Sequence, residues 1–479
     1  MNGPFHSEYP LVEAVQVTDP LSAVRAIAHL PYPFLLHSGT LDARARWSFF
    51  GADPFAMFRG DDLPAARTMW RRLSAQMLTS DPSPTLVPFT GGAVGYWAYD
   101  YGRRLERWPE FARDDLGLPD AMLGFYDVVG AYDHQTRQAW LFSSGLPMEE
   151  EPLRRGRAEQ RLDRFMRLFE SGRRATARLP QPREQTWHPT STFSADRYRA
   201  AVDEVKRLIA AGEIFQANLS QRWTLELGRH DPLSTGLALF ESLDLFSPAP
   251  HAALFGAGDH VIVSASPERF LELRGRHVEA RPIKGTRGRA ADAERDARLK
   301  AELLASEKDR AENVMIVDVL RNDLGRVCET GSVQVAALCE LETFPQVHHL
   351  TSTVTGELRD GNDAFDLLHA CFPGGSITGA PKLRAIDVLD RLEPVRRHIY
   401  TGSVGYLDWR GDADWNIAIR TALVTGSALH FAAGGGVTAE SDPEAEYQET
   451  LLKAEGLRRA LERVVGPVAL APELSGTGG

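Results

Sequence analysis

A carboxylate and an amine stand in two short motifs that a predicted hairpin would bring together. Glu268 lies in Ser-Pro-Glu-Arg-Phe (266–270) and Lys284 in Arg-Pro-Ile-Lys-Gly-Thr (281–286). The runs between them flank an Arg-Gly-Arg turn, a pattern typical of two paired strands. A three-residue loop at 275–277 would place Glu268 opposite Lys284, whereas a two-residue loop would put them on opposite faces. A buried pair could supply an acid and a nucleophile. The alternative is a surface cross-strand pair, worth about a few tenths of a kcal/mol.

Further charged residues fall on the core-facing stripes of two predicted helices, over 292–322 and 443–465. They are Glu312 in the first helix and Glu446, Glu449 and Lys453 in the second. Buried anions are costly unless they are paired or bound to a metal, and magnesium prefers oxygen ligands, typically one or two carboxylates. We therefore predict a magnesium site at Glu312 and Glu449. A buried Lys–Glu ion pair involving Lys453 is the alternative.

Two glycine-rich segments and one arginine could receive a substrate with two negative charges. Phe-Pro-Gly-Gly-Ser-Ile-Thr-Gly-Ala-Pro-Lys (372–382) leads into one predicted helix, and Ala-Gly-Gly-Gly-Val (433–437) precedes another. Free backbone N–H groups at the start of a helix bind anions. Between these segments, an alternating stretch over 415–424 puts Arg420 on the face opposite two isoleucines. An arginine in that position can clamp a carboxylate with two hydrogen bonds.

Composition excludes several classes of protein. The 479 residues are enough for two or three domains, and the formal net charge of −11 comes without a concentrated basic stretch, so we expect no nucleic-acid partner. No apolar run approaches a membrane span, and the first residues lack the pattern of a secretion signal. Three scattered cysteines suit a reducing cytoplasm, and none stands in a Gly-x-Cys-x-Gly turn, so we expect no internal glutaminase.

The order of elements predicts an α+β fold, because runs of strands and runs of helices do not alternate as they do in a doubly wound sheet. A polar, proline-containing linker at 171–190 divides the chain into regions 1–185 and 190–465, and we predict a disordered tail over 466–479. The other predicted elements are an exposed Arg-rich helix over 153–169, helices over 195–211 and 381–392, and strands over 260–266 and 277–283.

Seven motifs in one order resemble those of the chorismate-binding enzymes, a family that includes anthranilate, aminodeoxychorismate, isochorismate and salicylate synthases. They are GGAVGYWAYD, SPERF, RPIKGT, DRAENVMIVDVLRNDLGRV, VHHLTSTV, FPGGSITGAPK and AGGGVTAESDPEAEYQE. The resemblance is dense over 190–465 and looser in the N-terminal part. It implies antiparallel sheets packed as a sandwich with helices outside, as in component I of anthranilate synthase.

Two positions separate the branches of this family. Anthranilate and isochorismate synthases resemble one another in an alanine before the Gly-Thr of RPIKGT, whereas aminodeoxychorismate synthases have lysine, as here at Lys284. Members that use water have a lysine where this chain has Gln216. The resemblance therefore implies amination of chorismate at C4, with ammonia from a separate glutaminase subunit. The alternatives are anthranilate formation and a non-catalytic chorismate-binding subunit.

The resemblance also implies a role for each site residue. Lys284 is the covalent nucleophile, Glu268 is the general acid, and His349 lies near the reacting ring. Glu312 and Glu449 hold Mg²⁺, with Glu446 and Asp309 nearby. The positions that match substrate contacts are Thr286, Ser376, Tyr400, Arg420, Gly434, Gly436 and Lys453.

One N-terminal motif departs from the feedback-regulated members of the family. Those enzymes resemble one another in a Leu-Leu-Glu-Ser motif that holds tryptophan, and this chain has Leu-Leu-His-Ser (35–38). The resemblance implies a tryptophan pocket at Ser38 and the Ser-Pro-Ala-Pro segment (247–250). This chain has His37 where those enzymes have glutamate, which argues against feedback control. The alternative to a tryptophan pocket is an ordinary strand packed in the core.

Overall fold

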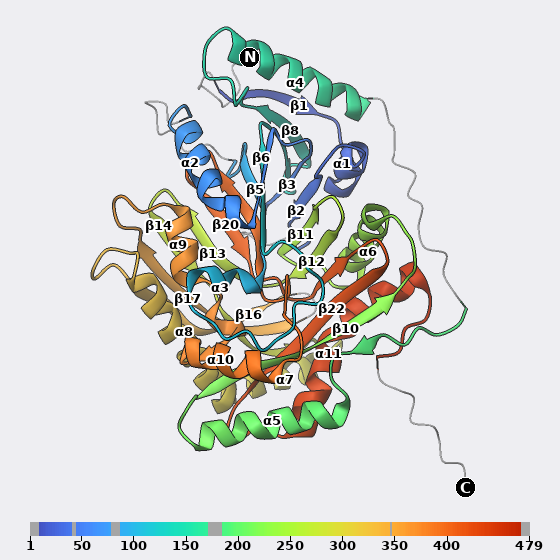
Figure 1. Ribbon diagram of the computed structural model, residues 1–479, viewed down its shortest axis with the longest axis vertical. Helices are drawn as coiled ribbons and strands as arrows, with labels where there is room; N and C mark the ends of the chain where they lie inside the picture. Colours follow the sequence, from blue (N-terminus) through green and yellow to red (C-terminus); the bar gives the residue numbers. More distant parts are fainter. Residues whose placement is uncertain (1–8, 41–44, 78–86, 171–183, 345–346, 471–479) are drawn as a thin grey trace.

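Two large antiparallel β-sheets face each other and helices cover their outer sides (Figure 1). The computed structural model describes residues 9–40, 45–77, 87–170, 184–344 and 347–470. Within these residues one sheet has 12 strands and the other 10. This arrangement confirms the predicted α+β sandwich.

The strands and helices have the following bounds. The first sheet contains, in pairing order, β1 (Leu11–Val15), β8 (Gln138–Ser143), β7 (Val128–Asp133), β3 (Trp47–Gly51), β2 (Phe34–His37), β11 (His251–Gly256), β12 (Val261–Ser266), β21 (Thr421–Val424), β22 (Ala428–Val437), β10 (Gln216–Glu226) and β18 (Gly379–Ala380), with β9 (Thr190–Ser191) beside β10. The second contains β15 (Ile283–Gly288), β17 (Val347–Glu357), β14 (His277–Ala280), β13 (Arg269–Arg274), β20 (Ala413–Asn416), β19 (Ser403–Asp408), β5 (Gly92–Trp97), β6 (Ala121–Tyr126) and β4 (Ala56–Arg59), with β16 (Gln334–Thr343) beside β17. The helices are α1 (Pro20–Ile27), α2 (Leu63–Ser74), α3 (Gly102–Leu105), α4 (Leu153–Glu170), α5 (Ala195–Ala210), α6 (Pro232–Phe246), α7 (Ala293–Ala305), α8 (Glu307–Gly325), α9 (Ala364–Cys371), α10 (Lys382–Leu392) and α11 (Pro443–Val465), with 3-10 turns η1 (Gly60–Asp62), η2 (Tyr99–Tyr101) and η3 (Gly375–Ile377).

One core lies between the sheets, where strands β2, β3, β7 and β11 of the first meet β5, β6 and β19 of the second. Phe34 and Tyr126 pack edge to face there, with ring centroids 4.7 Å apart. Outer cores lie under α1, α4, α6 and α11 on the first sheet and under α2, α8 and α9 on the second. Because both faces of these strands are covered, β6 and β7 are buried along their whole length, which suits their nearly continuous apolar sequences.

Both sheets take strands from both predicted regions of the chain. β2 pairs with β11, and β5 pairs with β19. Regions 1–185 and 190–465 therefore share their cores, and the division itself stays a prediction. Figure 1 places α4 and β1 at one end of the molecule and α5 at the other.

The structure corrects the single long helix predicted over 292–322. Two helices, α7 and α8, meet at Ser306, whose extended backbone ends the first. The Ser306 hydroxyl accepts the Asp309 N–H at 3.2 Å and so caps the second. The predicted helices over 195–211, 381–392 and 443–465 correspond to α5, α10 and α11.

Helix α4 is less exposed than its arginines predict. Arg161 is buried and donates hydrogen bonds to Asp127 and Asp53, and the Asp127 side chain is fully buried. Paired carboxylates thus allow arginines to face the core, which a composition-based interpretation misses.

The first residues of the segment 466–479, predicted to be a disordered tail, pack against the rest of the chain. Trp187 and Val468 form a parallel bridge, and Val468 is buried. Residues 471–479, like the linker residues 171–183, lie outside the described residues. In the part of the chain that the structure describes, no helix is long and apolar enough to cross a membrane.

Candidate active site

The hairpin between the two chemical motifs has a two-residue loop. Arg274 pairs with His277, so of the two loop lengths that the sequence left open the shorter one is present. Glu268 and Lys284 therefore do not face each other across that ladder. Lys284 belongs instead to β15, which pairs with β17.

Lys284 lies at an irregularity in the β15–β17 ladder. The register shifts by one residue between Ile283 and Thr286. Gly285 has φ +83°, and a Cβ on it would come within 2.9 Å of the Asp309 side chain. Such a bulge, built on a glycine, redirects the side chain beside it. Here it brings the Lys284 amine to 3.8 Å from Glu312 of α8.

Glu268 is buried and held by two donors. The Ser376 hydroxyl donates to its Oε1 at 2.7 Å, and the Ile283 N–H donates to the same carboxylate. Burial raises the pKa of Glu268 to about 7, although both donors favour the ionised form. A substantial part of this carboxyl is therefore protonated near neutral pH, and the protonated form is the one that a general acid needs. Because Ile283 precedes Lys284, the same contact brings the predicted acid beside the predicted nucleophile.

The Lys284 side chain is also buried, with 11% of its surface exposed. Burial lowers the pKa of its amine below the ordinary value; nearby Lys453 lowers it further, and Glu312 raises it. Burial likewise raises the pKa of Glu312. Both shifts favour neutral groups, and a neutral amine is the nucleophilic form of lysine.

The three predicted metal ligands converge from α8 and α11, each beside a lysine. Lys453 lies 2.7 Å from Glu449, Lys308 lies 3.5 Å from Glu446, and Lys284 is next to Glu312. The sequence left open a buried ion pair of Lys453. The pair with Glu449 is present but not buried, since its two side chains are 46% and 42% exposed. Among the described residues, no three His, Cys, Asp or Glu side chains are assembled at metal-binding distances.

The acidic cluster nevertheless fits a hard cation in donor type and orientation. A Cβ on Gly435 would lie 2.7 Å from Oε2 of Glu446 and 3.5 Å from Oε1 of Glu449. Oε2 of Glu446 is buried and has no hydrogen-bond partner among the described residues. Buried carboxylate oxygens without a donor carry a large desolvation cost, which a divalent cation would offset.

Arg420 and His349 form a second part of the site. The His349 ring and the Thr286 hydroxyl are 2.8 Å apart. Burial, with Arg420 nearby, lowers the pKa of His349 to about 4, so the ring is neutral at pH 7. Among the described residues no carboxylate pairs with the Arg420 guanidinium, and burial lowers its pKa. An arginine left without a counter-ion in such a place suits an anionic ligand.

The predicted continuous strand over 415–424 is wrong. β20 ends at Asn416 in one sheet and β21 begins at Thr421 in the other, so the segment between them crosses from sheet to sheet. Arg420 has φ +50°, in the left-handed region that non-glycine residues rarely adopt. This conformation, not strand alternation, presents the arginine.

Glycines 434–436 lie where β22 pairs with β10. A Cβ on Gly434 would come within 2.5 Å of the Leu219 carbonyl oxygen, and one on Gly436 within 2.0 Å of Nε2 of Gln216. Side chains are therefore excluded, which leaves the backbone accessible at close range. Lys453 donates to the Gly434 carbonyl at 2.9 Å. Tyr400 is buried beside β10, where the Asn218 side chain hydrogen-bonds its hydroxyl.

Sequence patterns missed one residue of the site, Lys308, which pairs with Glu446. It lies four residues before Glu312 on α8, so helical spacing could have found it. Gln216, which the family resemblance singled out, is buried, and its Oε1 has no hydrogen-bond partner among the described residues. It lies against Gly436, where two distant segments of the chain meet.

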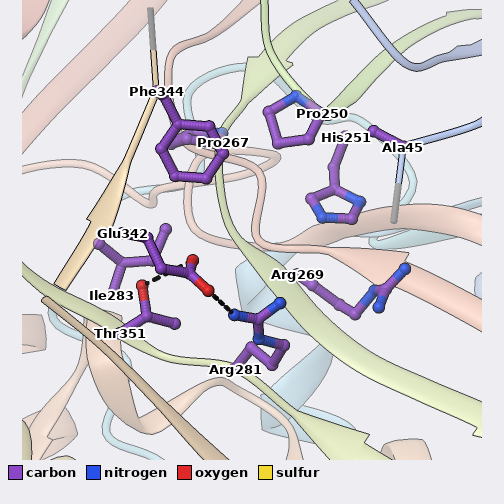
Figure 2. Close-up of a pocket in the computed structure, with 10 residues that line it drawn as sticks. All are labelled: Ala45, Pro250, His251, Pro267, Arg269, Arg281, Ile283, Glu342, Phe344 and Thr351. Carbon is purple, nitrogen blue, oxygen red and sulfur yellow. Dashed lines mark hydrogen bonds and ion pairs between the residues drawn. The ribbon is translucent and has the colours of Figure 1, made fainter. Parts of the chain in front are cut away.

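The predicted tryptophan pocket at Ser38 lies apart from this cluster. Ser38 donates to the Trp47 carbonyl at 2.8 Å and, with Pro250 and Tyr406, lines a pocket. A neighbouring pocket shares Pro250 and His251 with it and reaches Pro267 and Ile283 (Figure 2). Those last two residues precede Glu268 and Lys284, so this second pocket lies next to the predicted acid and nucleophile. Tryptophan binding at Ser38 stays a prediction.

Comparison with known proteins agrees with the geometry. A family model described as chorismate binding enzyme matches residues 33–459. The chain belongs to the family of chorismate-binding enzymes. The aminodeoxychorismate synthase component 1 of Salmonella typhimurium is 39% identical over 452 residues, which cover 91% of this chain and 94% of that protein. The anthranilate synthase component 1 of Streptomyces coelicolor is 38% identical over 476 residues, which cover 96% and 89%.

Solved structures share the fold. Component I of anthranilate synthase from Streptococcus pneumoniae gives a TM-score of 0.73 at 30% identity and covers 87% of this chain and 93% of its own. The menaquinone-specific isochorismate synthase from Escherichia coli gives a TM-score of 0.70 at 20% identity, over 95% of both chains. The second likeness concerns the fold alone.

The contact between Ser376 and Glu268 makes a prediction about pH. Ser376→Ala removes a donor that favours ionised Glu268, so the pKa of this carboxyl should rise above about 7, by roughly half a unit to one unit for one hydrogen bond. Since the acid acts in its protonated form, activity is lost as the pH rises through this pKa. The loss should therefore move to higher pH in the variant.

The measurement is the rate of chorismate consumption against pH at a constant concentration of free ammonia. Ser242→Ala, a buried serine of α6 away from the cluster, is the control and should leave the profile in place. A Ser376→Ala profile that stays in place or moves to lower pH would show that Glu268 is not the titrating acid.

Proposed function

We propose that this chain converts chorismate and ammonia into 4-amino-4-deoxychorismate, with Lys284 as a covalent nucleophile. The observation that carries this proposal is the buried Lys284 amine, held at a bulge beside Glu268 and Glu312. Overall identity does not separate the two aminating activities, because relatives of both kinds lie at 36–39%. Residue 284 does separate them on physical grounds. An alanine there would leave room for ammonia to attack C2 directly, whereas the lysine occupies that space.

The reaction has two balanced steps. The Lys284 amine attacks C2 of chorismate, the ring double bonds shift, and the C4 hydroxyl leaves as water after Glu268 has donated a proton. Ammonia then attacks C4, the double bonds shift back, and the C2–N bond breaks, which returns the electron pair to Lys284. The net change replaces the C4 hydroxyl with an amino group and releases one water. Gln216 supports ammonia as the external nucleophile, since a neutral amide cannot act as the base that activates water.

Cationic and backbone groups bind the two carboxylates of chorismate. Arg420 and Lys453 supply charge, and the glycines of β22 supply close backbone contact. Mg²⁺ would be held by Glu312, Glu446 and Glu449, where it would neutralise a substrate carboxylate. Thr286, Ser376 and Tyr400 complete the polar lining.

We infer that ammonia comes from outside this chain. All three cysteines are buried, and burial raises the pKa of Cys328 to about 11 and that of Cys371 above its ordinary value, which disfavours at these two positions the reactive thiolate that a glutaminase needs. The relatives are named component 1, which supports a separate component. We infer that the partner is a glutaminase subunit in the cytoplasm.

We also infer that the pocket at Ser38 binds tryptophan.

The proposed activity predicts which product forms and from which nitrogen source. The purified chain should convert chorismate to aminodeoxychorismate with ammonium, but not with glutamine alone. Lys284→Ala should form this product at least about 100-fold more slowly, roughly 3 kcal/mol of lost transition-state stabilisation. Part of its product should carry the amine at C2. Lys300→Ala of α7 is the control and should behave as wild type.

Product mass and absorbance, followed by chromatography against both amino isomers, decide this test. Anthranilate as the main wild-type product would contradict the proposal. So would a Lys284→Ala variant that forms aminodeoxychorismate at the wild-type rate.

The acidic cluster predicts a metal dependence. Glu312→Gln and Glu446→Gln each remove one anionic ligand, so half-maximal activity should need at least about tenfold more Mg²⁺, the scale on which even outer-sphere partners act. The folded state should persist, as thermal unfolding can show. Glu307→Gln, an exposed residue on the same helix α8, is the control. Wild-type activity of either variant at limiting Mg²⁺ would assign these carboxylates to the lysine pairs alone.

A further inference from the structure

A buried ion pair outside the reacting groups joins several segments of the site. Arg397 and Glu393 lie in the stretch after α10, and their side chains are 3% and 7% exposed. Nε and Nη2 of Arg397 donate to the two oxygens of Glu393, each at 2.7 Å. Pairs of this kind often contribute little to net stability, because the desolvation cost is large. The role of this pair is therefore sought in the other groups that Arg397 and Glu393 contact, rather than in the stability that their charges contribute.

The guanidinium uses all of its donors. Nη1 donates to the Ile377 carbonyl at 2.9 Å and to the Thr401 hydroxyl at 3.3 Å, and Nη2 also donates to the Asn218 carbonyl at 2.5 Å. With the two bonds to Glu393, these contacts engage the five N–H groups of an arginine. Its cationic carbon also lies 4.7 Å from the Tyr99 ring centroid. A lysine has three donors on one nitrogen and cannot reproduce this arrangement.

Each acceptor belongs to a segment that carries a site residue. Ile377 follows Ser376, which holds Glu268. Asn218 hydrogen-bonds Tyr400 and lies opposite Gly436 in the ladder.

Glu393 extends the same network to the glycine strand. Its Oε1 accepts both the N–H and the hydroxyl of Ser220, which pairs with Gly434.

The backbone around Tyr400 is held in an unfavourable conformation. His398 has φ +53° and Thr401 has φ +62°, both outside the regions that non-glycine residues prefer. Such conformations persist only where the surrounding contacts over-determine them. Arg397, which contacts Thr401 and the two segments opposite, supplies those contacts.

We propose that Arg397 is a positioning residue for the reaction, which acts through the Ile377 carbonyl to hold the Ser376 hydroxyl against Glu268. The inference rests on the proposed role of Glu268 as the acid. It assigns to Arg397 a function in catalysis that a buried structural ion pair would not have. Glu393 fixes the guanidinium and ties it to β10.

A double-mutant cycle tests this proposal. Arg397→Lys keeps the charge but loses the fork, so kcat for chorismate consumption should fall roughly 10- to 100-fold, the scale of a small misplacement at a reacting centre. The pH at which activity is lost should move upward, as in Ser376→Ala. The double variant that combines Arg397→Lys with Ser376→Ala should have a kcat only slightly below that of the slower single variant, because both changes act on the same contact, that of Ser376 with Glu268.

Arg161→Lys in α4 is the matched control, since Arg161 is also buried and paired but lies in the N-terminal network with Asp127 and Asp53. It should lower the melting temperature while kcat stays within about twofold of wild type. If Arg397→Lys does not fold, Glu393→Gln, which keeps the shape but loses the charge, takes its place and should show the same shift in pH.

Two results would overturn the proposal. One is an Arg397→Lys variant, or its Glu393→Gln substitute, whose kcat and pH profile match the Arg161→Lys control. The other is a double variant whose losses simply multiply. Chorismate consumption is measured whatever the product, so a wild-type enzyme that made anthranilate would refute the proposed function while the cycle would still judge Arg397.

Discussion

The shared burial of one amine and two carboxyls is the constraint on which the rest of the site depends. In water Lys284 would be protonated and Glu268 ionised, and neither could perform its proposed role. Burial lowers the pKa of Lys284 and raises that of Glu268 to about 7, so both move toward the neutral forms that attack and protonate. Glu312 limits the first shift by its charge, since it is the main group that favours the protonated amine.

Irregular backbone, rather than regular strands, presents the reacting groups. Lys284 lies at a bulge in one sheet, and Arg420, whose backbone has a positive φ, lies in the segment that crosses between the sheets. The glycines of β22 have no side chains, so other groups can approach their backbone closely. Each lies where segments distant in sequence meet. The sandwich provides the rigid frame for them, because strands covered on both faces cannot shift without disturbing a close-packed core.

Periodicity predicted the helices and the α+β class well, because α5, α10 and α11 carry clear apolar stripes and the side chains of Ser194 and Asp442 cap α5 and α11. It failed at Ser306, where one hydroxyl divides a continuous pattern into two helices. It left the hairpin undecided, since one residue of loop length decides which face a side chain occupies and spacing does not encode that residue. Glu268 and Lys284 are neighbours for another reason, the donation of the Ile283 N–H to Glu268. Arg397 was not predicted at all, because its acceptors come from segments separated by 20 and 179 positions.

The most direct test of the covalent role of Lys284 is the mass of the protein itself. Wild-type protein would be mixed with chorismate and Mg²⁺ in the absence of ammonia, quenched with acid and digested. We expect the peptide that contains Lys284 to gain the mass of chorismate less one water, and ammonia added before the quench should remove this gain. An unmodified Lys284 peptide, in protein that makes aminodeoxychorismate once ammonia is added, would contradict covalent catalysis by this lysine.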